Sequence, residues 1–90
     1  MKKILVAGAG LAGCTAARLL AEQGHQLTIY EAREHIGGNI YDEKQASGIT
    51  RQIYGPHIFH TRQQEIWQFV TRFTKMRPFQ HRVLSYTQGQ

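Results

Sequence analysis

The stretch that decides the fold is Ile4–Gly13, ILVAGAGLAG. An apolar run leads into glycines at positions 8, 10 and 13, and a helix-forming run, Ala16–Glu22, follows. A strand, a tight turn and a helix are the context in which a G-x-G-x-x-G spacing binds a dinucleotide. The first glycine allows a sharp turn, the second lets the backbone approach a pyrophosphate, and the third lets the helix pack against the strand. The sequence therefore predicts phosphate binding at the N-terminus of that helix.

The segments around this turn complete a βαβ unit. We expect a strand over Lys3–Ala7, buried on both faces because it is almost continuously apolar. A helix over Ala12–Gln23 and a second strand over Gln26–Tyr30 follow, with Gly24 at the helix end. Two strands joined in this way are parallel, with a right-handed crossover. The fold class is therefore α/β, with a Rossmann-like parallel βαβ unit at its start.

Glu31 closes the second strand, about 20 residues after the glycine turn. A carboxylate at that offset accepts hydrogen bonds from the two hydroxyls of an adenosine ribose. The alternative is a solvated acid at a strand end. A negative charge here disfavours a 2′-phosphate, so we do not expect NADP at this site.

A second pair of glycines, Gly37 and Gly38, lies in the segment REHIGGN that ends at Asn39. Plain NAD-binding folds do not require this pair. It lets a second backbone segment approach the dinucleotide, because glycine has no side chain to keep the two apart. A flexible turn is the alternative.

Two histidines, His57 and His60, follow a break in regular structure at Tyr54-Gly55-Pro56. Their spacing suits a metal pair on a helix, but no third His, Cys or acidic ligand follows at a suggestive distance, so we expect no metal site. We interpret both histidines as polar contacts to a ligand, with structural hydrogen bonding as the alternative.

The remaining chain is predicted to contain four further segments. We expect a loop or hairpin over Ile40–Thr50 and a short strand over Gln52–Tyr54. A second helix over Thr61–Thr74 would have Thr61 as its N-cap and an apolar stripe at helical spacing. A strand is expected over Arg82–Gln88.

Composition excludes several classes of function. The net charge is +5, from eleven Lys and Arg against six Asp and Glu, but the basic residues form no dense run or RNA-binding motif. We therefore expect no nucleic-acid partner. No stretch approaches the roughly 20 apolar residues of a membrane span, so we expect no membrane partner either.

The single cysteine, Cys14, excludes an internal disulfide and suits a reducing cytoplasm, where we expect the protein to be. Another interpretation takes the first residues as a bacterial lipoprotein signal in which Cys14 is lipidated. Three glycines in the apolar stretch and an amphipathic helix after Cys14 disfavour it.

The glycine turn, Glu31 and the glycine pair together resemble the extended FAD-binding fingerprint of glutathione-reductase-like and amine-oxidase-like flavoproteins. Within that group, His35–Asn39 (HIGGN) and Tyr54–Thr61 (YGPHIFHT) resemble the start of UDP-galactopyranose mutases. Trp67 and the segment Phe79–Gln90 are also similar to that family. The second motif is far more specific than the glycine fingerprint.

This resemblance implies a flavin-dependent isomerase that interconverts UDP-galactopyranose and UDP-galactofuranose, a precursor of bacterial surface polysaccharides. The implied reaction is redox-neutral but needs reduced FAD, with the flavin as nucleophile and the protein supplying position and electrostatics. The implied partner is the nucleotide sugar.

The resemblance also implies roles for individual residues. His57 would position the flavin as the catalytic residue, and His81 would contact the nucleotide sugar. The implied cofactor-binding residues are Gly8, Gly10, Ala12, Gly13, Glu31, Ala32, Gly38, Asn39, His57 and Ile58.

With 90 residues, the chain is far shorter than members of that family. We expect residues 1–90 to form a partial FAD-binding domain, without the substrate domain and inactive alone. One alternative is another amine-oxidase-like flavoprotein. Another is a non-catalytic remnant that binds a nucleotide or a partner chain, and a homodimer is left open.

Overall fold

The computed structural model describes residues 1–78 and 84–85. The chain divides into two compact units, Met1–Ile58 and Phe59–Gln90. Each unit is described separately below.

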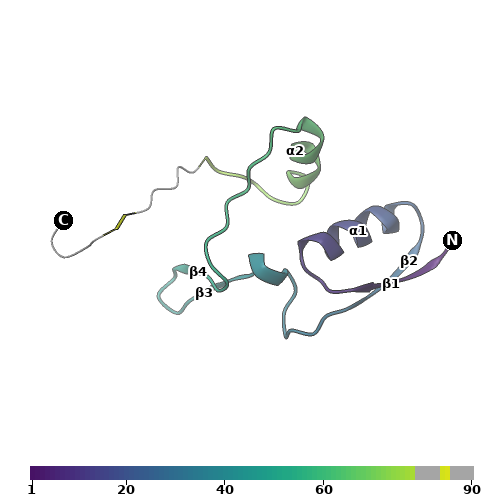
Figure 1. The fold of residues 1–90 in the computed structure, drawn as a ribbon, viewed down its shortest axis with the longest axis horizontal. Coiled ribbons are helices and arrows are strands. Elements are labelled where there is room, and N and C mark those ends of the chain that lie inside the picture. The colour runs from purple at the N-terminus through teal and green to yellow at the C-terminus, as the bar shows by residue number, and fades with distance from the viewer. Residues whose placement is uncertain (79–83, 86–90) are drawn as a thin grey trace. The chain divides into compact units, whose positions relative to one another are not determined.

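The first unit begins with the βαβ motif that the glycine spacing predicts. Strand β1 (Lys3–Ala7) leads into helix α1 (Leu11–Glu22), which returns the chain to strand β2 (Gln26–Tyr30) (Figure 1). The strands are parallel, in register from Lys3 opposite Gln26 to Ala7 opposite Tyr30. The α/β class and the parallel βαβ topology are confirmed, with the helix one residue earlier than predicted.

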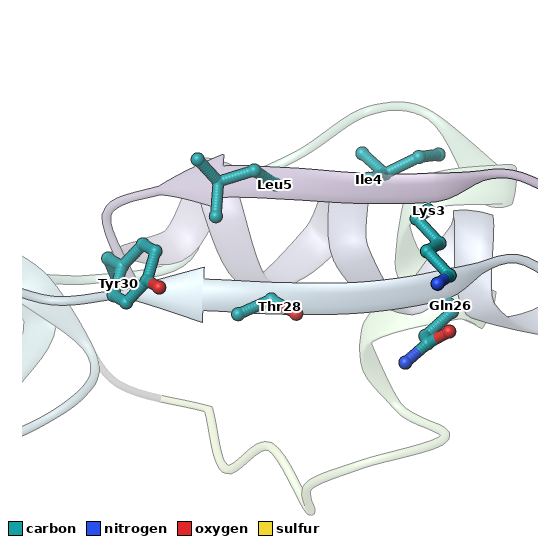
Figure 2. A pocket seen from close by; sticks show the side chains of 6 residues that line it. All are labelled: Lys3, Ile4, Leu5, Gln26, Thr28 and Tyr30. Atoms are coloured by element: carbon teal, nitrogen blue, oxygen red, sulfur yellow. The ribbon is translucent and has the colours of Figure 1, made fainter.

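The prediction that β1 is buried on both faces is wrong. Ile4 and Val6 are half-buried, whereas Leu5 between them is 62% exposed. A parallel strand is buried on both faces only where both are covered. Here α1 lies behind one face of the sheet, and the other face is open (Figure 2). Among the described residues, the buried hydrophobic positions are two alanines, Ala9 and Ala17.

A 3₁₀ turn, η1 (Gly38–Ile40), leads into an antiparallel hairpin of β3 (Asp42–Lys44) and β4 (Thr50–Gln52). The predicted hairpin is confirmed. The predicted strand over Gln52–Tyr54 is wrong, because the ladder with β3 already ends at the Asp42–Gln52 pair. The Gly55 N–H instead donates to the Gln52 carbonyl oxygen at 3.3 Å and closes a turn.

The second unit contains helix α2 (Gln64–Val70), which is shorter than the predicted Thr61–Thr74. Thr61 is not its N-cap, because the Thr61 hydroxyl accepts from the Gln63 N–H at 3.1 Å, before the first turn of the helix. After α2 ends at Val70, the backbone forms turns in which the Phe73 N–H donates to the Val70 carbonyl. The predicted strand Arg82–Gln88 lies outside the described residues except for Leu84 and Ser85. Within the described part of the chain, no helix combines the length and apolar character needed to cross a bilayer.

Candidate nucleotide-binding site

The turn between β1 and α1 is formed by backbone atoms in close contact. Gly8 has a φ of +106°, a conformation that glycine adopts without strain, and its N–H donates to the Tyr30 carbonyl at 2.7 Å. A Cβ atom on Gly13 would collide with the Gly8 carbonyl oxygen. The first turn of α1 therefore approaches the end of β1 as closely as a glycine allows. The backbone roles predicted for these two glycines are observed.

The first turn of α1 presents backbone N–H groups that bind nothing within the described residues. The first intrahelical bond runs from the Cys14 N–H to the Gly10 carbonyl at 2.9 Å, so Leu11, Ala12 and Gly13 donate no such bond. The first turn of α1 carries no acidic residue. Ala12 is exposed beside these donors. The arrangement is suited to a phosphate group, which the helix dipole also favours.

The second glycine pair lies directly against this turn. The Gly37 N–H donates to the Ala9 carbonyl at 2.7 Å. Gly38 has a φ of +60°, and a Cβ atom there would lie 2.9 Å from Gly10 Cα. The pair is therefore no simple flexible turn, since it brings a second backbone segment onto the first.

Glu31 links the end of β2 to the same turn. Its Oε1 accepts from the Ala9 N–H and its Oε2 from the Arg33 N–H, both at 2.9 Å. These bonds, Arg33 first and then Ala9, hold the pKa of the carboxyl below its usual range, and the Ala32 N–H adds to the effect. Glu31 is therefore more than a solvated acid. A carboxylate has about four acceptor positions, so two remain for ligand hydroxyls.

Asn39 is held beside Glu31 through Arg33. The Arg33 guanidinium donates from Nη1 to Asn39 Oδ1 at 3.1 Å, and both residues are exposed. Ala32, between Glu31 and Arg33, is exposed as well. The structure thus brings the predicted cofactor residues from the turn, the strand end and the glycine pair to one edge of the sheet.

His57 and Ile58 lie at the end of the first unit. His57 Nδ1 is shielded from solvent and has no hydrogen-bond partner within the described residues. A shielded ring nitrogen without a partner is costly, so a hydrogen bond to it would be favourable. Ile58 is 51% exposed. No hydrogen bond among the described residues joins either side chain to the glycine turn, so the structure does not bring them into that cluster.

The structure places neither of the other candidate histidines, His60 and His81, at this site. His60 is exposed and belongs to the second unit, and His81 lies outside the described residues. In residues 1–78 and 84–85, no group of three or more His, Cys, Asp or Glu side chains is arranged to hold a metal ion.

A hollow lies on the open face of the β1–β2 sheet, away from α1 (Figure 2). Figure 2 shows Leu5, Thr28 and Tyr30 together on this face. Lys3, Ile4 and Gln26 complete its lining. It contains neither the glycine turn nor Glu31, so it is distinct from the candidate site.

Sequence reasoning missed a cluster of rings beside the glycine pair. The rings of His35 and Tyr41 stack at 3.7 Å between centroids, and His35 Nε2 lies 2.8 Å from the Tyr54 hydroxyl. The Arg33 guanidinium lies 4.2 Å from the centre of the Tyr54 ring. No regular spacing connects these positions, so only the quoted motifs containing His35 and Tyr54 offered a signal.

The fold and site define a class: this chain belongs to the family described as NAD(P)-binding Rossmann-like domain, which matches residues 6–73. A nucleotide-type cofactor follows from that membership. Over the whole of this chain, the sequence is 44% identical to a dTDP-fucopyranose mutase of Escherichia coli. Over 99% of this chain, it is 42% identical to a probable UDP-galactopyranose mutase of Klebsiella pneumoniae. The resemblance to UDP-galactopyranose mutases is confirmed.

A more distant relative is an L-amino-acid oxidase of Mus musculus, 37% identical over 82% of the chain. The chain covers 24% of the Escherichia coli relative, 23% of the Klebsiella pneumoniae relative and 13% of the oxidase. It therefore spans about a quarter of the length of the mutases that it matches.

Proposed function

We propose that this chain binds FAD and forms the cofactor-binding part of a mutase that interconverts UDP-galactopyranose and UDP-galactofuranose. The observation that supports it most is the contact between two glycine segments, in which Gly38 lies against Gly10 beside the carboxylate of Glu31. One glycine segment suffices for a plain dinucleotide turn. The second, and the similarity to two named pyranose mutases, favour the flavin and the mutase.

In this proposal the pyrophosphate binds the free N–H groups at the start of α1, with Gly8, Gly10, Ala12 and Gly13 lining the turn. Glu31 accepts from the adenosine ribose, and Ala32 follows it along the strand end. Gly38 and Asn39 border the cofactor, whereas His57 and Ile58 contact the flavin ring. The shielded, unpartnered Nδ1 of His57 supports that contact.

When bound in its reduced form, FAD supplies the nucleophile for a redox-neutral ring interconversion. This chain's residues bind and orient the cofactor, and His57 positions the flavin ring. The nucleotide sugar and the contact proposed for His81 belong to the whole protein. Cys14 is a free thiol, which fits our proposal that the protein acts in the cytoplasm.

Similarity to two of the relatives supports two alternatives to the proposed activity. The similarity to a dTDP-fucopyranose mutase favours a different nucleotide sugar on the same site, and the similarity to an L-amino-acid oxidase favours another flavoprotein of amine-oxidase type. Both alternatives keep the FAD site, so substrate turnover separates them.

The first test is an absorbance spectrum of this chain after incubation with FAD, FMN or NAD⁺ and removal of the free ligand. FMN is the matched control because it carries the flavin ring without the adenosine that Glu31 would bind. We expect retention of FAD only, lost in Glu31→Gln with an unchanged far-UV circular dichroism spectrum. Retention of NAD⁺ in place of FAD would contradict the proposal that the cofactor is a flavin. Retention of FMN would contradict the proposal that Glu31 binds the adenosine ribose.

The second test supplies reduced flavin and either UDP-galactofuranose or dTDP-fucofuranose to the whole protein of which this chain is the cofactor-binding part, with chromatography of the products. Conversion of the first to its pyranose supports the main proposal. Conversion of the second sugar alone would indicate a dTDP sugar as the substrate. A separate assay with oxidised flavin, dioxygen and an L-amino acid tests the oxidase alternative, which release of hydrogen peroxide would support.

A further inference from the structure

We propose that His35 is a positioning residue that fixes the flavin-contacting segment Tyr54–His57 relative to the glycine turn, acting through Tyr54. The inference rests on the proposed FAD site. It concerns the ring cluster defined by Arg33, His35, Tyr41 and Tyr54, to which the proposed function gives no role.

The hydrogen bonds of His35 define the tautomer of its neutral ring. Its Nδ1 lies 2.9 Å from the Ile36 carbonyl oxygen, which can only accept, so Nδ1 carries the proton. In a neutral ring Nε2 is then an acceptor, and the Tyr54 hydroxyl, 2.8 Å away, donates to it. The ring also stacks on Tyr41, with an interplanar angle of 10°. Two hydrogen bonds and one stack thus hold His35 in one orientation.

Tyr54 is held by contacts and not by burial. The residue is 43% exposed, yet its hydroxyl is bound by His35 and its ring lies under the Arg33 guanidinium. A cation over a tyrosine ring at this distance is attractive. Two neighbours of the glycine pair therefore hold this ring from different sides.

The same neighbours are bound to the glycine turn. Arg33 donates its N–H to Glu31, which binds Ala9 through its other oxygen. On the far side of His35, the Gly37 N–H donates to the Ala9 carbonyl. The segment carrying Arg33 and His35 is thus fixed to the turn at both ends.

His57 follows Tyr54 by three residues, a span of at most roughly 11 Å even when fully extended. Pro56 has a restricted φ and further limits the path between them. Fixing the Tyr54 ring therefore restricts where the unpartnered His57 Nδ1 can lie. Without the His35–Tyr54 hydrogen bond, the Tyr54 side chain keeps only weaker ring contacts with Arg33 and His35, and the turn bond from the Gly55 N–H to the Gln52 carbonyl holds the backbone.

The test uses a matched set of variants of the protein. Tyr54→Phe removes the hydroxyl and keeps the ring. Its control is Tyr30→Phe, since the Tyr30 hydroxyl makes no hydrogen bond within the described residues and 66% of the residue is exposed. His35→Phe keeps the stack on Tyr41 but binds no hydroxyl, whereas His35→Gln offers Tyr54 an acceptor without the aromatic stack.

The first readout needs no cofactor. Two-bond ¹H–¹⁵N spectra of the histidine rings at pH 8 should show His35 protonated on Nδ1. The His57 ring resonances should shift in Tyr54→Phe and His35→Phe, return toward wild type in His35→Gln, and stay unchanged in Tyr30→Phe. A proton on Nε2 of His35, or His57 resonances that ignore Tyr54→Phe, would overturn the inference.

The second readout is the visible flavin spectrum and the FAD dissociation constant. We expect about fivefold weaker binding in Tyr54→Phe and His35→Phe, as for one lost hydrogen bond, with an altered flavin band that His35→Gln restores. Wild-type affinity and an unaltered band in both variants would also overturn it. If the wild-type protein binds no FAD, the proposed function fails, while the histidine spectra still decide whether His35 positions His57.

Discussion

The glycine turn and the open face of the sheet lie a few residues apart on the same strand, yet they are built in opposite ways. At the turn, backbone meets backbone, and a single added carbon on Gly13 would strike the Gly8 carbonyl. On the open face, Leu5 and Tyr30 are 62% and 66% exposed. The conformation of this βαβ unit is therefore determined by close backbone contacts and not by a large apolar core.

The largest expected effect comes from Gly13→Ala. Alanine favours a helix over glycine by about 1 kcal/mol, so helix propensity alone would stabilise the variant. The collision with a backbone carbonyl, which cannot rotate away as a flexible side chain can, should outweigh this gain. We expect a net loss of about 2 kcal/mol in the free energy of unfolding, measured by urea titration. The exposed Ala16→Gly in the same helix should lose only about 1 kcal/mol, and a stabilised Gly13→Ala would contradict the close contact.

Gly38→Ala is expected to come second. Alanine at a φ of +60° costs about 1 kcal/mol, and its Cβ would also press on Gly10 Cα. Gly48→Ala is the matched control, because Gly48 has a φ of +89° and nothing within 4 Å of the added carbon. Urea titration should show a larger loss for Gly38→Ala than for Gly48→Ala. Equal losses would mean that the two glycine segments do not touch in solution.

Glu31 gives the turn a dependence on pH. Because the pKa of Glu31 is lowered on folding from an ordinary value of 4.5, its stabilising effect is present above that value and is lost as the pH falls through the depressed pKa. We expect the free energy of unfolding to decrease below pH 4.5 in the wild-type protein. Urea titrations from pH 6 to pH 3 should show a shallower decrease in Glu31→Gln. Parallel curves would show that the carboxylate does not bind the Ala9 and Arg33 amides.

The smallest effect is expected on the open face. Leu5→Thr should change the free energy of unfolding by less than about 0.5 kcal/mol, as for an exposed position that favours β-branched residues. Val6→Thr, one residue along on the half-buried face toward α1, should cost about 1 kcal/mol because it replaces a methyl group there with a hydroxyl that loses water on folding. Thermal unfolding of the pair compares the two faces, and an equally damaging Leu5→Thr would indicate that another surface covers this face.

The βαβ unit could be predicted from sequence because its signals are local. Glycines at positions 8, 10 and 13 require a turn, and the flanking runs determine the strand and helix. Burial could not be predicted, since an apolar strand such as Lys3–Ala7 does not reveal how many of its faces are covered. Thr61 resembled an N-cap, but its hydroxyl binds Gln63 ahead of the helix.

The candidate site was predictable where one residue type has one physical reason, as for the paired glycines and Glu31. The ring cluster was not, because His35 and Tyr54 are 19 residues apart and their bond depends on how the hairpin returns the chain. Such contacts follow from the path of the backbone, which composition and spacing do not determine.

The Ala9 peptide has a further consequence for experiments. Its carbonyl accepts from both Gly37 and the Cys14 thiol, with Cys14 Sγ at 3.4 Å. Cys14 is half-buried and is the single cysteine of the chain. The rate at which Cys14 is alkylated therefore reports how often the turn opens. A ligand that holds the turn closed should slow that chemistry, so protection of one thiol can report binding in a mixture without any optical signal from the ligand.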